Sequence, residues 1–327
     1  MKKKHLLIIL LFIACTDYYG HFVPLGDEFE DCWKKINFED LIYHIEASKI
    51  NRNEFFIGSQ YNIYILQDSI IKRLPITYPY RASTVIASSF NTPQRLLIGT
   101  DNREVYYCSM DGVIKIISFP DIEQIEHLSF SPLDTSIFYL AGNSILLKSD
   151  IAGVDIDTIL SSSEKIINLS VKESGELFVA TTHFLFCSID QGLRWDTLYT
   201  LETDLISGFA MDKKQRLYLL IQKRILMSQD WTNWIELYHG NYSAATIAGI
   251  EDGLLLFYSD GLNVNAFKLY ADGKVYDISM GIVHNFASIS ELPVIAVVND
   301  KRFLISFSDD LEKESTLLSF SDTPLPP

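Results

Sequence analysis

Residues 177–200 read LFVATTHFLFCSIDQGLRWDTLYT, and this stretch decides the fold. It holds three short runs rich in Val, Phe, Leu and Tyr, separated by the polar pair Thr182-His183 and by the turn at Ser188–Trp195. A fourth run, INLSVKE at 167–173, precedes it. Short runs of this composition bounded by Gly, Asn, Asp or Ser are typical of β-strands, because helices need longer segments with a 3.6-residue period. The sequence therefore predicts a unit of four strands here.

The same unit recurs about every 40 residues along the chain. The second run of each copy starts at Phe55, Leu96, Ile137, Leu177, Leu217, Leu254 and Val294. A strand-like piece precedes each of them, such as IYHIEA in the first copy and HNFASIS at 284–290 in the last. Four strands per repeat at this spacing indicate a propeller blade. We therefore predict an all-β fold, a seven-bladed β-propeller of four-stranded antiparallel blades over residues 39–320.

The turn between the third and fourth strands carries a recurring Asp. In the fourth copy the turn fits the pattern S-x-D-x-G-x-x-W, in which Asp190 and Ser188 can accept hydrogen bonds from backbone amides of the turn. Gly192 can take the positive φ that the reversal needs, and Trp195 can cover the strand ends. The other copies have Asp at the same place: Asp68, Asp111, Asp150, Asp230, Asp272 and Asp310. We expect a structural role in the turn for these residues, with a bound metal ion as the alternative.

With this turn, the chain resembles the Asp-box propeller families. These include the bacterial neuraminidase-type repeat proteins, the sortilin-type propellers and the photosystem II assembly-factor-like propellers. In those families the Asp-box lies on the blade turn away from the ligand-binding face. The resemblance therefore implies a structural role for Ser188, Asp190, Gly192 and Trp195.

The N-terminus reads MKKKHLLIILLFIAC, with three lysines and then an apolar stretch from Leu6 to Ile13. This is the pattern of a signal peptide, and it is too short for a spanning helix. Its end resembles a bacterial lipobox, with cleavage after Ala14 and lipidation of Cys15; an ordinary secretory signal is the alternative. We therefore predict a signal peptide at 1–14 and an exported chain in the bacterial cell envelope, lipid-anchored on the periplasmic or cell-surface side.

Residues 15–38 are predicted to form a lipidated tether. Phe29, Cys32, Trp33 and Ile36 fall on one face of a short helix, which either packs under the propeller or docks a partner. Residues 321–327 are predicted to be a loose C-terminal tail.

Cysteine and histidine spacing gives no sign of a metal or redox site. Cys108 and Cys187 take the same strand position in the second and fourth copies, too far apart for a disulfide, and are expected to be buried thiols. His127 and His284 open inner strands and are expected in the core or the central channel. The sequence contains no C-x-x-C or H-E-x-x-H pattern, and no cofactor or metal is predicted.

The formal net charge is −15, and removal of the signal peptide with its three lysines makes it more negative. Such a chain repels nucleic acid, so nucleic acid is not expected as a partner. We expect a monomer that binds an envelope protein or a glycan.

A sialidase-like glycoside hydrolase is the enzyme alternative, because Arg73-Leu74-Pro75 matches a sialidase motif. The resemblance implies that such an Arg points from an inner strand into the central pocket. Arg73 instead falls in the outer strand of the first copy, and no Tyr-Glu nucleophile pair can be placed. The sequence therefore predicts no catalysis and no catalytic residue.

In propellers the turns between second and third strands, together with the links between blades, build the ligand face. The predicted binding face consists of Tyr61, Asn62, Asp101, Arg103, Asn143, His183, Lys223, Arg224, Asp260, Asn263, Lys301 and Arg302. We predict a non-catalytic lipoprotein that binds a protein partner in an assembly or scaffold role. A glycan-binding lipoprotein of a polysaccharide-uptake system is the alternative. Exposed aromatic pairs on this face would favour glycan, and a flat charged face of mixed sign would favour protein.

Overall fold

The computed structural model describes residues 22–23, 33–38, 42–51, 54–59, 62–67, 70–77, 83–240, 244–259, 264–278, 294–299, 302–308 and 315–321. Every regular element in these ranges is a β-strand. No helix in them is both long enough and apolar enough to cross a membrane.

The described strands form seven hydrogen-bonded sheets. Five are four-stranded antiparallel meanders, with these strands: β3 (Ile42–Ala47), β4 (Glu54–Ser59), β5 (Asn62–Gln67) and β6 (Ile70–Thr77); β7 (Ser83–Ser88), β8 (Arg95–Thr100), β9 (Glu104–Ser109) and β10 (Gly112–Ser118); β11 (His127–Phe130), β12 (Ile137–Gly142), β13 (Ile145–Asp150) and β14 (Ile156–Ser161); β15 (Ile166–Val171), β16 (Leu177–Thr181), β17 (Phe184–Ser188) and β18 (Asp196–Thr200); β19 (Ile206–Met211), β20 (Leu217–Ile221), β21 (Arg224–Ser228) and β22 (Trp234–His239).

Two further sheets include strands from the N-terminal part of the chain. One has the order β1-β26-β25-β24-β23 and the other the order β2-β29-β28-β27. The first consists of β1 (Phe22–Val23), β23 (Ala244–Gly249), β24 (Gly253–Ser259), β25 (Val264–Tyr270) and β26 (Val275–Asp277). The second consists of β2 (Trp33–Phe38), β27 (Val294–Asn299), β28 (Arg302–Ser308) and β29 (Ser315–Ser321).

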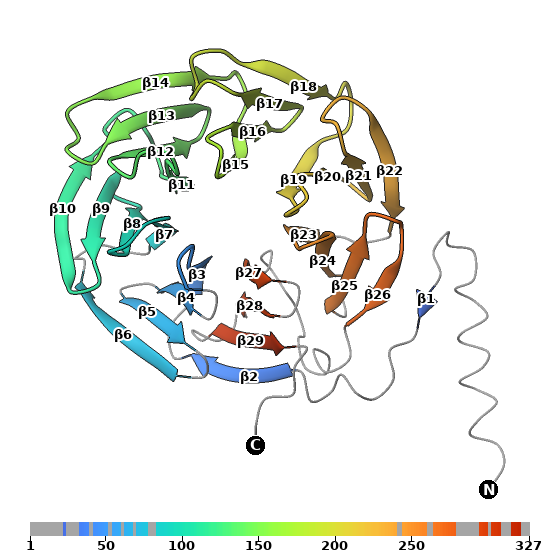
Figure 1. The fold of residues 1–327 in the computed structure, drawn as a ribbon, viewed down its shortest axis with the longest axis horizontal. Coiled ribbons are helices and arrows are strands. Elements are labelled where there is room, and N and C mark those ends of the chain that lie inside the picture. Colours follow the sequence, from blue (N-terminus) through green and yellow to red (C-terminus); the bar gives the residue numbers. More distant parts are fainter. Residues whose placement is uncertain are drawn as a thin grey trace, which may run out of the picture.

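The sheets stand around a central opening, each with its first strand innermost (Figure 1). The inner strands contact one another in a closed cycle: β3, β7, β11, β15, β19, β23, β27 and again β3. The prediction of an all-β propeller with four-stranded antiparallel blades is confirmed, and each sheet is called a blade below.

The last blade joins the two ends of the propeller. Its outermost strand is β2, which pairs antiparallel with β29 from Trp33 opposite Phe320 to Phe38 opposite Ser315. The expected helix at 29–36 is therefore wrong over 33–36, which form part of this strand. The predicted start of the propeller at residue 39 likewise leaves out β2.

The last repeat is also shifted by one strand from the sequence prediction. Residues 294–299 were expected as a second strand behind HNFASIS, but β27 contacts the inner strands β3 and β23. Residues 284–290 lie outside the described residues. The shift arises because β2, rather than a strand after β29, fills the outermost position.

Each blade runs between two faces of the ring. We call one the linker face; it holds the turns between second and third strands (101–103, 143–144, 182–183 and 222–223) and the links between blades (119–126, 162–165 and 201–205). The opposite face, called the Asp-turn face, holds the turns between first and second strands and those between third and fourth strands, with Asp111, Asp150, Asp190, Asp230 and Asp272. Because of the shift, the turn after Ser308 lies between the second and third strands of its blade, so its Asp residues do not mark a third-to-fourth-strand turn.

The second strand of each meander packs between two blades, as β16 illustrates. Leu177, Phe178 and Val179 have no exposed surface. Phe178 packs with Leu219 of the next blade, whereas Leu177 and Val179 pack with Tyr139 of the preceding one. Because alternate side chains of a strand point to opposite sides, a strand between two blades must be apolar throughout. This requirement explains the continuous apolar runs that define the repeat.

Cys108 in β9 and Cys187 in β17 are free and buried, so the prediction of buried thiols is confirmed. Burial raises the pKa of Cys108 to about 12 and that of Cys187 to about 11. Both thiols therefore stay protonated and behave as small apolar side chains. Cys15 and Cys32 lie outside the described residues.

The Asp turn of the fourth meander makes the contacts that its sequence predicts. The Ser188 hydroxyl donates to Asp190 Oδ1 (2.9 Å), which also accepts the Arg194 N–H (2.9 Å). The Gly192 N–H donates to Ser188 Oγ (2.8 Å), and Gly192 has φ +95°. The hydrogen bond from the Arg194 backbone lowers the pKa of Asp190, whose side chain is partly buried.

The equivalent Asp residues also bind backbone amides of their own turns. Asp150 Oδ1 accepts the Val154 N–H at 2.8 Å, Asp230 Oδ1 the Asn233 N–H at 2.7 Å, and Asp272 Oδ1 the Lys274 N–H at 3.1 Å. At Asp111 the contact differs, because its own N–H donates to Ser109 Oγ (3.2 Å). Asp68 and Asp310 lie outside the described residues.

The turn at Ser188–Trp195 also connects its blade to the preceding one. Trp195 Nε1 donates to the carbonyl oxygen of Ile159 in β14 (2.7 Å). A Cβ atom added at Gly192 would lie 2.6 Å from Cδ1 of the same Ile159. Gly192 is thus required both by its backbone angle and by the close approach of the neighbouring blade.

Gly192→Ala and Gly273→Ala separate these two requirements. Both glycines have positive φ, but a Cβ at Gly273 meets nothing within 4 Å. We expect Gly273→Ala to lower the free energy of unfolding by about 1–2 kcal/mol through backbone strain alone. Gly192→Ala should cost at least about 1 kcal/mol more, because Ile159 must move. Urea unfolding measures both, and equal losses would contradict the packing role of the turn.

A pair of truncations tests closure by β2. A chain beginning at residue 24 retains β2, whereas one beginning at residue 39 lacks it. We expect the shorter chain to lose about 3 kcal/mol or more of unfolding free energy, because several backbone hydrogen bonds disappear and the edge of β29 is exposed. Chemical unfolding followed by circular dichroism gives the comparison. Identical midpoints would show that the ring does not depend on this strand.

Candidate binding face

The linker face carries most of the residues predicted to bind a ligand. Asp101, Arg103, Asn143, His183 and Lys223 lie in turns between second and third strands, as predicted. Asn62 and Arg224 begin β5 and β21 at the same face. Tyr61, Asp260, Asn263 and Lys301 lie outside the described residues.

The predicted position of Arg302 on the binding face is wrong. It begins β28, the second strand of the shifted last blade, and therefore lies at the Asp-turn end of its sheet. The sequence prediction placed it on the linker face because it counted β28 as a third strand.

Backbone hydrogen bonds hold the turns of the linker face against the links. The carbonyl oxygen of Arg103 accepts the Phe119 N–H (2.8 Å), and that of His183 accepts the Leu201 N–H (2.9 Å). Arg103 and Asn143 have φ values of 62° and 57°, a conformation uncommon for residues other than glycine. The turn side chains therefore project from a backbone that tertiary contacts fix.

Glu164 is the centre of one side-chain network on this face. Its Oε2 accepts hydrogen bonds from Thr181 Oγ1 (2.9 Å), Thr182 Oγ1 (2.8 Å) and the His183 N–H (2.9 Å). Its Oε1 lies 2.7 Å from His183 Nδ1. Burial by itself would raise the pKa of Glu164, but the hydrogen bonds from Thr182, Thr181 and His183 outweigh it, so this pKa is lowered. The carboxylate is therefore charged at neutral pH and orients the His183 ring.

A separate set of polar contacts joins the same link to the preceding blade. Lys165 Nζ lies 2.6 Å from Glu126 Oε1, and the Asn143 N–H donates to Glu126 Oε2 (3.4 Å). Asn143 Nδ2 also donates to Glu123 Oε2 (3.0 Å). Because Glu164 and Lys165 are neighbours in one link, the contacts of His183 and those of Asn143 lie on adjacent blades at the two sides of that link.

A second network surrounds Arg224. Its guanidinium forms an ion pair with Asp204, and Nη1 lies 4.0 Å from Glu236 Oε2. Glu236 in turn lies 3.4 Å from His239 Nδ1. These residues come from a link, the start of β21 and the outermost strand β22, and together they form a charged surface of mixed sign.

The described part of the linker face is acidic. Its acids are Asp101, Glu104, Asp121, Glu123, Glu126, Glu164, Glu202 and Asp204, and its bases are Arg103, Lys165, Lys223 and Arg224. Tyr43, near the linker end of β3, is the one aromatic residue classed as exposed among the described residues. The arrangement can bind a cationic or hydrogen-bonding surface, and it offers no stacking platform of paired aromatics.

Sequence reasoning missed the acids of the links, including Glu123, Glu126, Glu164 and Asp204. A signal was present, since the links EQIE (123–126), SEK (163–165) and ETD (202–204) each carry acids shortly before an inner strand. The links differ in length, so these acids do not align between the copies.

His127 opens β11, as predicted, near His44 of β3. Burial lowers the pKa of His127 to about 4, and the charge of His44 acts in the same direction. His44 Nδ1 accepts the Ile86 N–H (3.2 Å), and burial lowers its pKa as well. Both rings are therefore neutral at physiological pH. No group of three His, Cys, Asp or Glu side chains in the described ranges is arranged to hold a metal ion.

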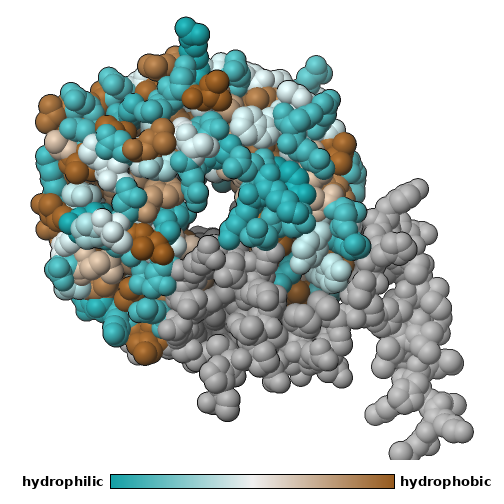
Figure 2. Space-filling model, viewed as in Figure 1, coloured by the Kyte–Doolittle hydropathy of each residue, from teal (hydrophilic) through white to brown (hydrophobic). Residues whose placement is uncertain are grey.

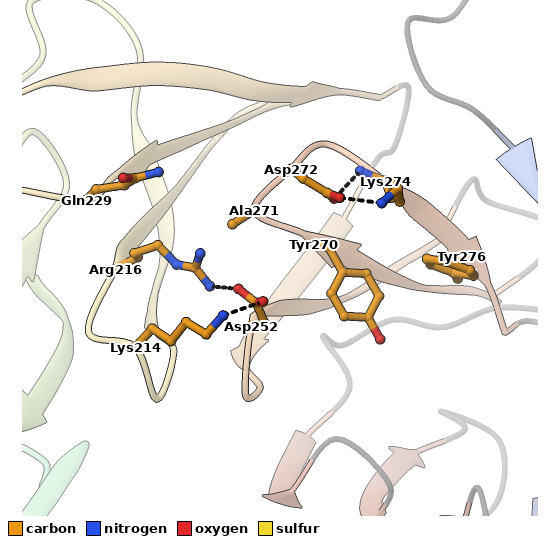
Figure 3. A pocket seen from close by; sticks show the side chains of 9 residues that line it. All are labelled: Lys214, Arg216, Gln229, Asp252, Tyr270, Ala271, Asp272, Lys274 and Tyr276. Atoms are coloured by element: carbon orange, nitrogen blue, oxygen red, sulfur yellow. Dashed lines mark hydrogen bonds and ion pairs between the residues drawn. The ribbon is translucent and has the colours of Figure 1, made fainter.

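The Asp-turn face holds a pocket of about 540 Å³ between the blades β19–β22 and β23–β26 (Figure 3). Its charged groups already pair with one another. Arg216 binds Asp252 and lies 2.6 Å from Asp212, Lys214 lies 2.5 Å from Asp252, and Lys274 lies 2.6 Å from Asp272. The pocket therefore presents compensated charge together with Tyr270 and Tyr276.

No protein-family model matches the sequence, and no curated protein matches it either. Solved structures do resemble the fold. "YCF48 bound to D1 peptide" aligns with TM-score 0.64 at 11% identity, over 89% of this chain and 97% of that one. The β-propeller domain of Cps50 (Swd1) from Myceliophteria thermophila aligns with TM-score 0.62 at 10% identity, over 88% and 100% of the two chains. A chain of the mitotic checkpoint complex aligns with TM-score 0.66 at 10% identity, over 91% and 94%. At these identities the likeness establishes the fold alone.

Glu164→Gln tests the first network through its pH dependence. The pKa of Glu164 is lowered by folding, so its contribution to stability is full above its unfolded pKa of about 4.3 and is lost as pH falls through the folded value. We expect the variant to lose about 2 kcal/mol of unfolding free energy at pH 7 and to approach the parent protein once the pH is below the lowered pKa of Glu164. The exposed Glu202, changed to Gln, is the control. A pH-independent difference would contradict the charged network.

Proposed function

We propose that the chain is a non-catalytic, seven-bladed β-propeller lipoprotein of the bacterial cell envelope, anchored through Cys15, that binds a protein partner through its linker face in an assembly or scaffold role. The observation that carries the proposal is the chemistry of that face. On this face acids outnumber bases. Ion pairs fix several of its side chains, and backbone hydrogen bonds hold its turns. Mixed charge of this kind suits a protein surface.

The comparisons support a binding role at the level of fold. Each of the three similar structures is a propeller or contains one, and one of them was solved with a bound peptide. Propellers expose a rigid face built from turns and links, where binding residues can vary without disturbing the core.

The glycan alternative has less support. Sugar rings stack on exposed aromatic side chains, and in the described part of the linker face Tyr43 is the one exposed aromatic residue, with no aromatic partner classed as exposed beside it. The sialidase alternative depends on Arg73, which lies exposed in β6, the outermost strand of its blade. It is therefore not placed to bind a carboxylate at the axis.

Charge reversal tests the proposal. The tagged lipoprotein carrying Asp101→Lys, Asp121→Lys and Glu202→Lys should recover its envelope partner at least about tenfold less well than the parent protein, because attraction to a basic surface becomes repulsion. The three acids are exposed, so the fold should persist. Affinity capture from the native envelope with quantitative mass spectrometry gives the measurement.

The matched control is Asp111→Lys, Asp155→Lys and Glu173→Lys, an equal change in charge among exposed acids of the Asp-turn face. It should leave recovery unchanged. Equal loss in both variants would show that net charge, rather than the linker face, determines binding. Recovery of no protein, together with retention on a polysaccharide array, would refute a protein partner and favour glycan.

A further inference from the structure

The Asp-turn side of the propeller carries nearly all of the exposed aliphatic residues. In the part of the chain that the structure describes, every large hydrophobic residue classed as exposed, except Tyr43 and Leu205, lies in a turn of this face or on an outermost strand that starts there. We call Ile70, Ile114, Val154, Ile189, Leu193 and Ile235 the aliphatic rim. Leu193 is 84% exposed, Val154 77% and Ile189 74%.

The aliphatic rim recurs from blade to blade around part of the ring. Its members come from five consecutive blades, from β6 in the first meander to β22 in the fifth. Figure 2 shows hydrophobic residues along the outer rim over β6, β10 and β14, on an otherwise largely hydrophilic surface. The next blade in the ring, β23–β26, is the one that β1 joins. Large exposed apolar patches mark interaction sites, and the rim residues of these five blades all lie on the same side of the ring.

The direction of β1 shows where the N-terminal segment leaves the propeller. β1 is parallel to β26, with Phe22 opposite Val275 and Val23 opposite Tyr276. β26 starts directly after the turn at Asp272 and runs away from the Asp-turn face. The chain ahead of Phe22 therefore emerges at the Asp-turn face.

The position of Cys15 then limits the distance to a membrane. Seven residue steps separate Cys15 from Phe22, which span at most about 25 Å when fully extended. An acyl chain on Cys15 would hold the Asp-turn side of the blade β23–β26 within that distance of the leaflet. The opposite, acidic linker face would be about a blade height farther away.

The Asp-turn side carries charges of both signs, since the exposed acids Asp111, Asp155 and Glu173 lie there as well, and such a surface is compatible with a zwitterionic lipid. Asp150, Asp190 and Asp230 bind backbone amides of their own turns, so their charge is partly compensated. Lys115 and Arg194 are exposed and directly follow rim residues. Such side chains can reach headgroups while adjacent aliphatic groups enter the interface.

From these observations we propose that the aliphatic rim rests on the lipid leaflet to which the chain is anchored, which turns the linker face toward the partner. The proposal rests on the lipid anchor of the proposed function. It assigns the rim one occupant, a phospholipid surface, and it gives the exposed residues of five blades a common role.

The test uses a mature chain carrying Cys32→Ser, with Cys15 coupled chemically to a maleimide lipid in phosphatidylcholine vesicles. Hydroxyl-radical footprinting with mass spectrometry then compares side-chain oxidation in the coupled and free protein. We expect oxidation of Val154, Ile189 and Leu193 to fall at least about twofold on coupling, because lipid excludes water from them. Oxidation of Leu205 on the linker face should not change.

Two results would overturn the proposal. One is unchanged oxidation of the rim, and the other is equal protection of Leu205, which would mean that the vesicle shields the protein without direction. Rim protection in the free protein that grows with protein concentration would assign the rim to a second copy of the chain, and it would also refute the proposal.

Substitution adds an independent test. With Val154, Ile189 and Leu193 changed to Ser, the coupled protein should lose the protection of Ile70 and Ile114, because too little apolar surface remains to hold the orientation. The control Leu205→Ser should retain that protection. Full protection in the triple variant would contradict the role of the rim.

Failure of the lipid anchor itself is measured separately. Mass spectrometry of the N-terminal peptide from cells shows whether Cys15 is acylated. Unmodified Cys15 would refute the lipoprotein part of the proposed function and leave the footprinting result unaffected, because the coupling there is chemical.

Discussion

The pairing of β2 with β29 is the contact on which the rest of the structure depends. A ring of sheets that contact only their neighbours has two free ends, and the fold is complete only when those ends are joined. Here a strand from before the first blade supplies the outermost position of the last blade, so backbone hydrogen bonds join the two ends of the propeller. Once the ring is closed, every second strand lies between two blades, and the positions of both faces are set.

The closed ring separates two kinds of surface. The Asp turns bind their own backbone amides, and the turn at Ser188 also fastens its blade to the preceding one through Trp195 and Ile159. Those turns keep the strand ends in register without contributing to a binding site. The opposite turns and links carry Glu164, Glu126 and Arg224 in networks that project charge from a fixed backbone. The same repeated unit thus provides the Asp-turn face, whose turns are held by local hydrogen bonds, and the linker face, whose charged residues differ from blade to blade.

Much of the fold follows from the sequence. Apolar runs that repeat about every 40 residues predict the four-stranded blades, because strands buried on both sides must be apolar throughout. The turn at Ser188–Trp195 predicts its own hydrogen bonds, since each residue type suits one position of the turn. Cys108 and Cys187 could be predicted as buried from their place in those runs.

The point of closure could not be predicted in the same way. The repeated sequence specifies the strands within each blade. It does not specify which strand of the chain begins the ring, because the spacing of the repeats is the same for every choice. WKKINF in β2 reads as part of a tether, and only its partner β29 makes it a strand. The error at closure moved Arg302 to the wrong face. The acids around Glu164 were missed because link residues do not align from copy to copy, and their partners are distant in sequence.

Site-specific photocrosslinking in intact cells tests the two-sided arrangement most directly. A photoreactive amino acid at Asp101 or Glu202 would probe the linker face, and one at Leu193 would probe the opposite side; all three positions are exposed. We predict protein adducts from Asp101 and Glu202, and lipid adducts from Leu193. Protein adducts confined to Leu193, with none from the linker face, would contradict the assignment of the two faces.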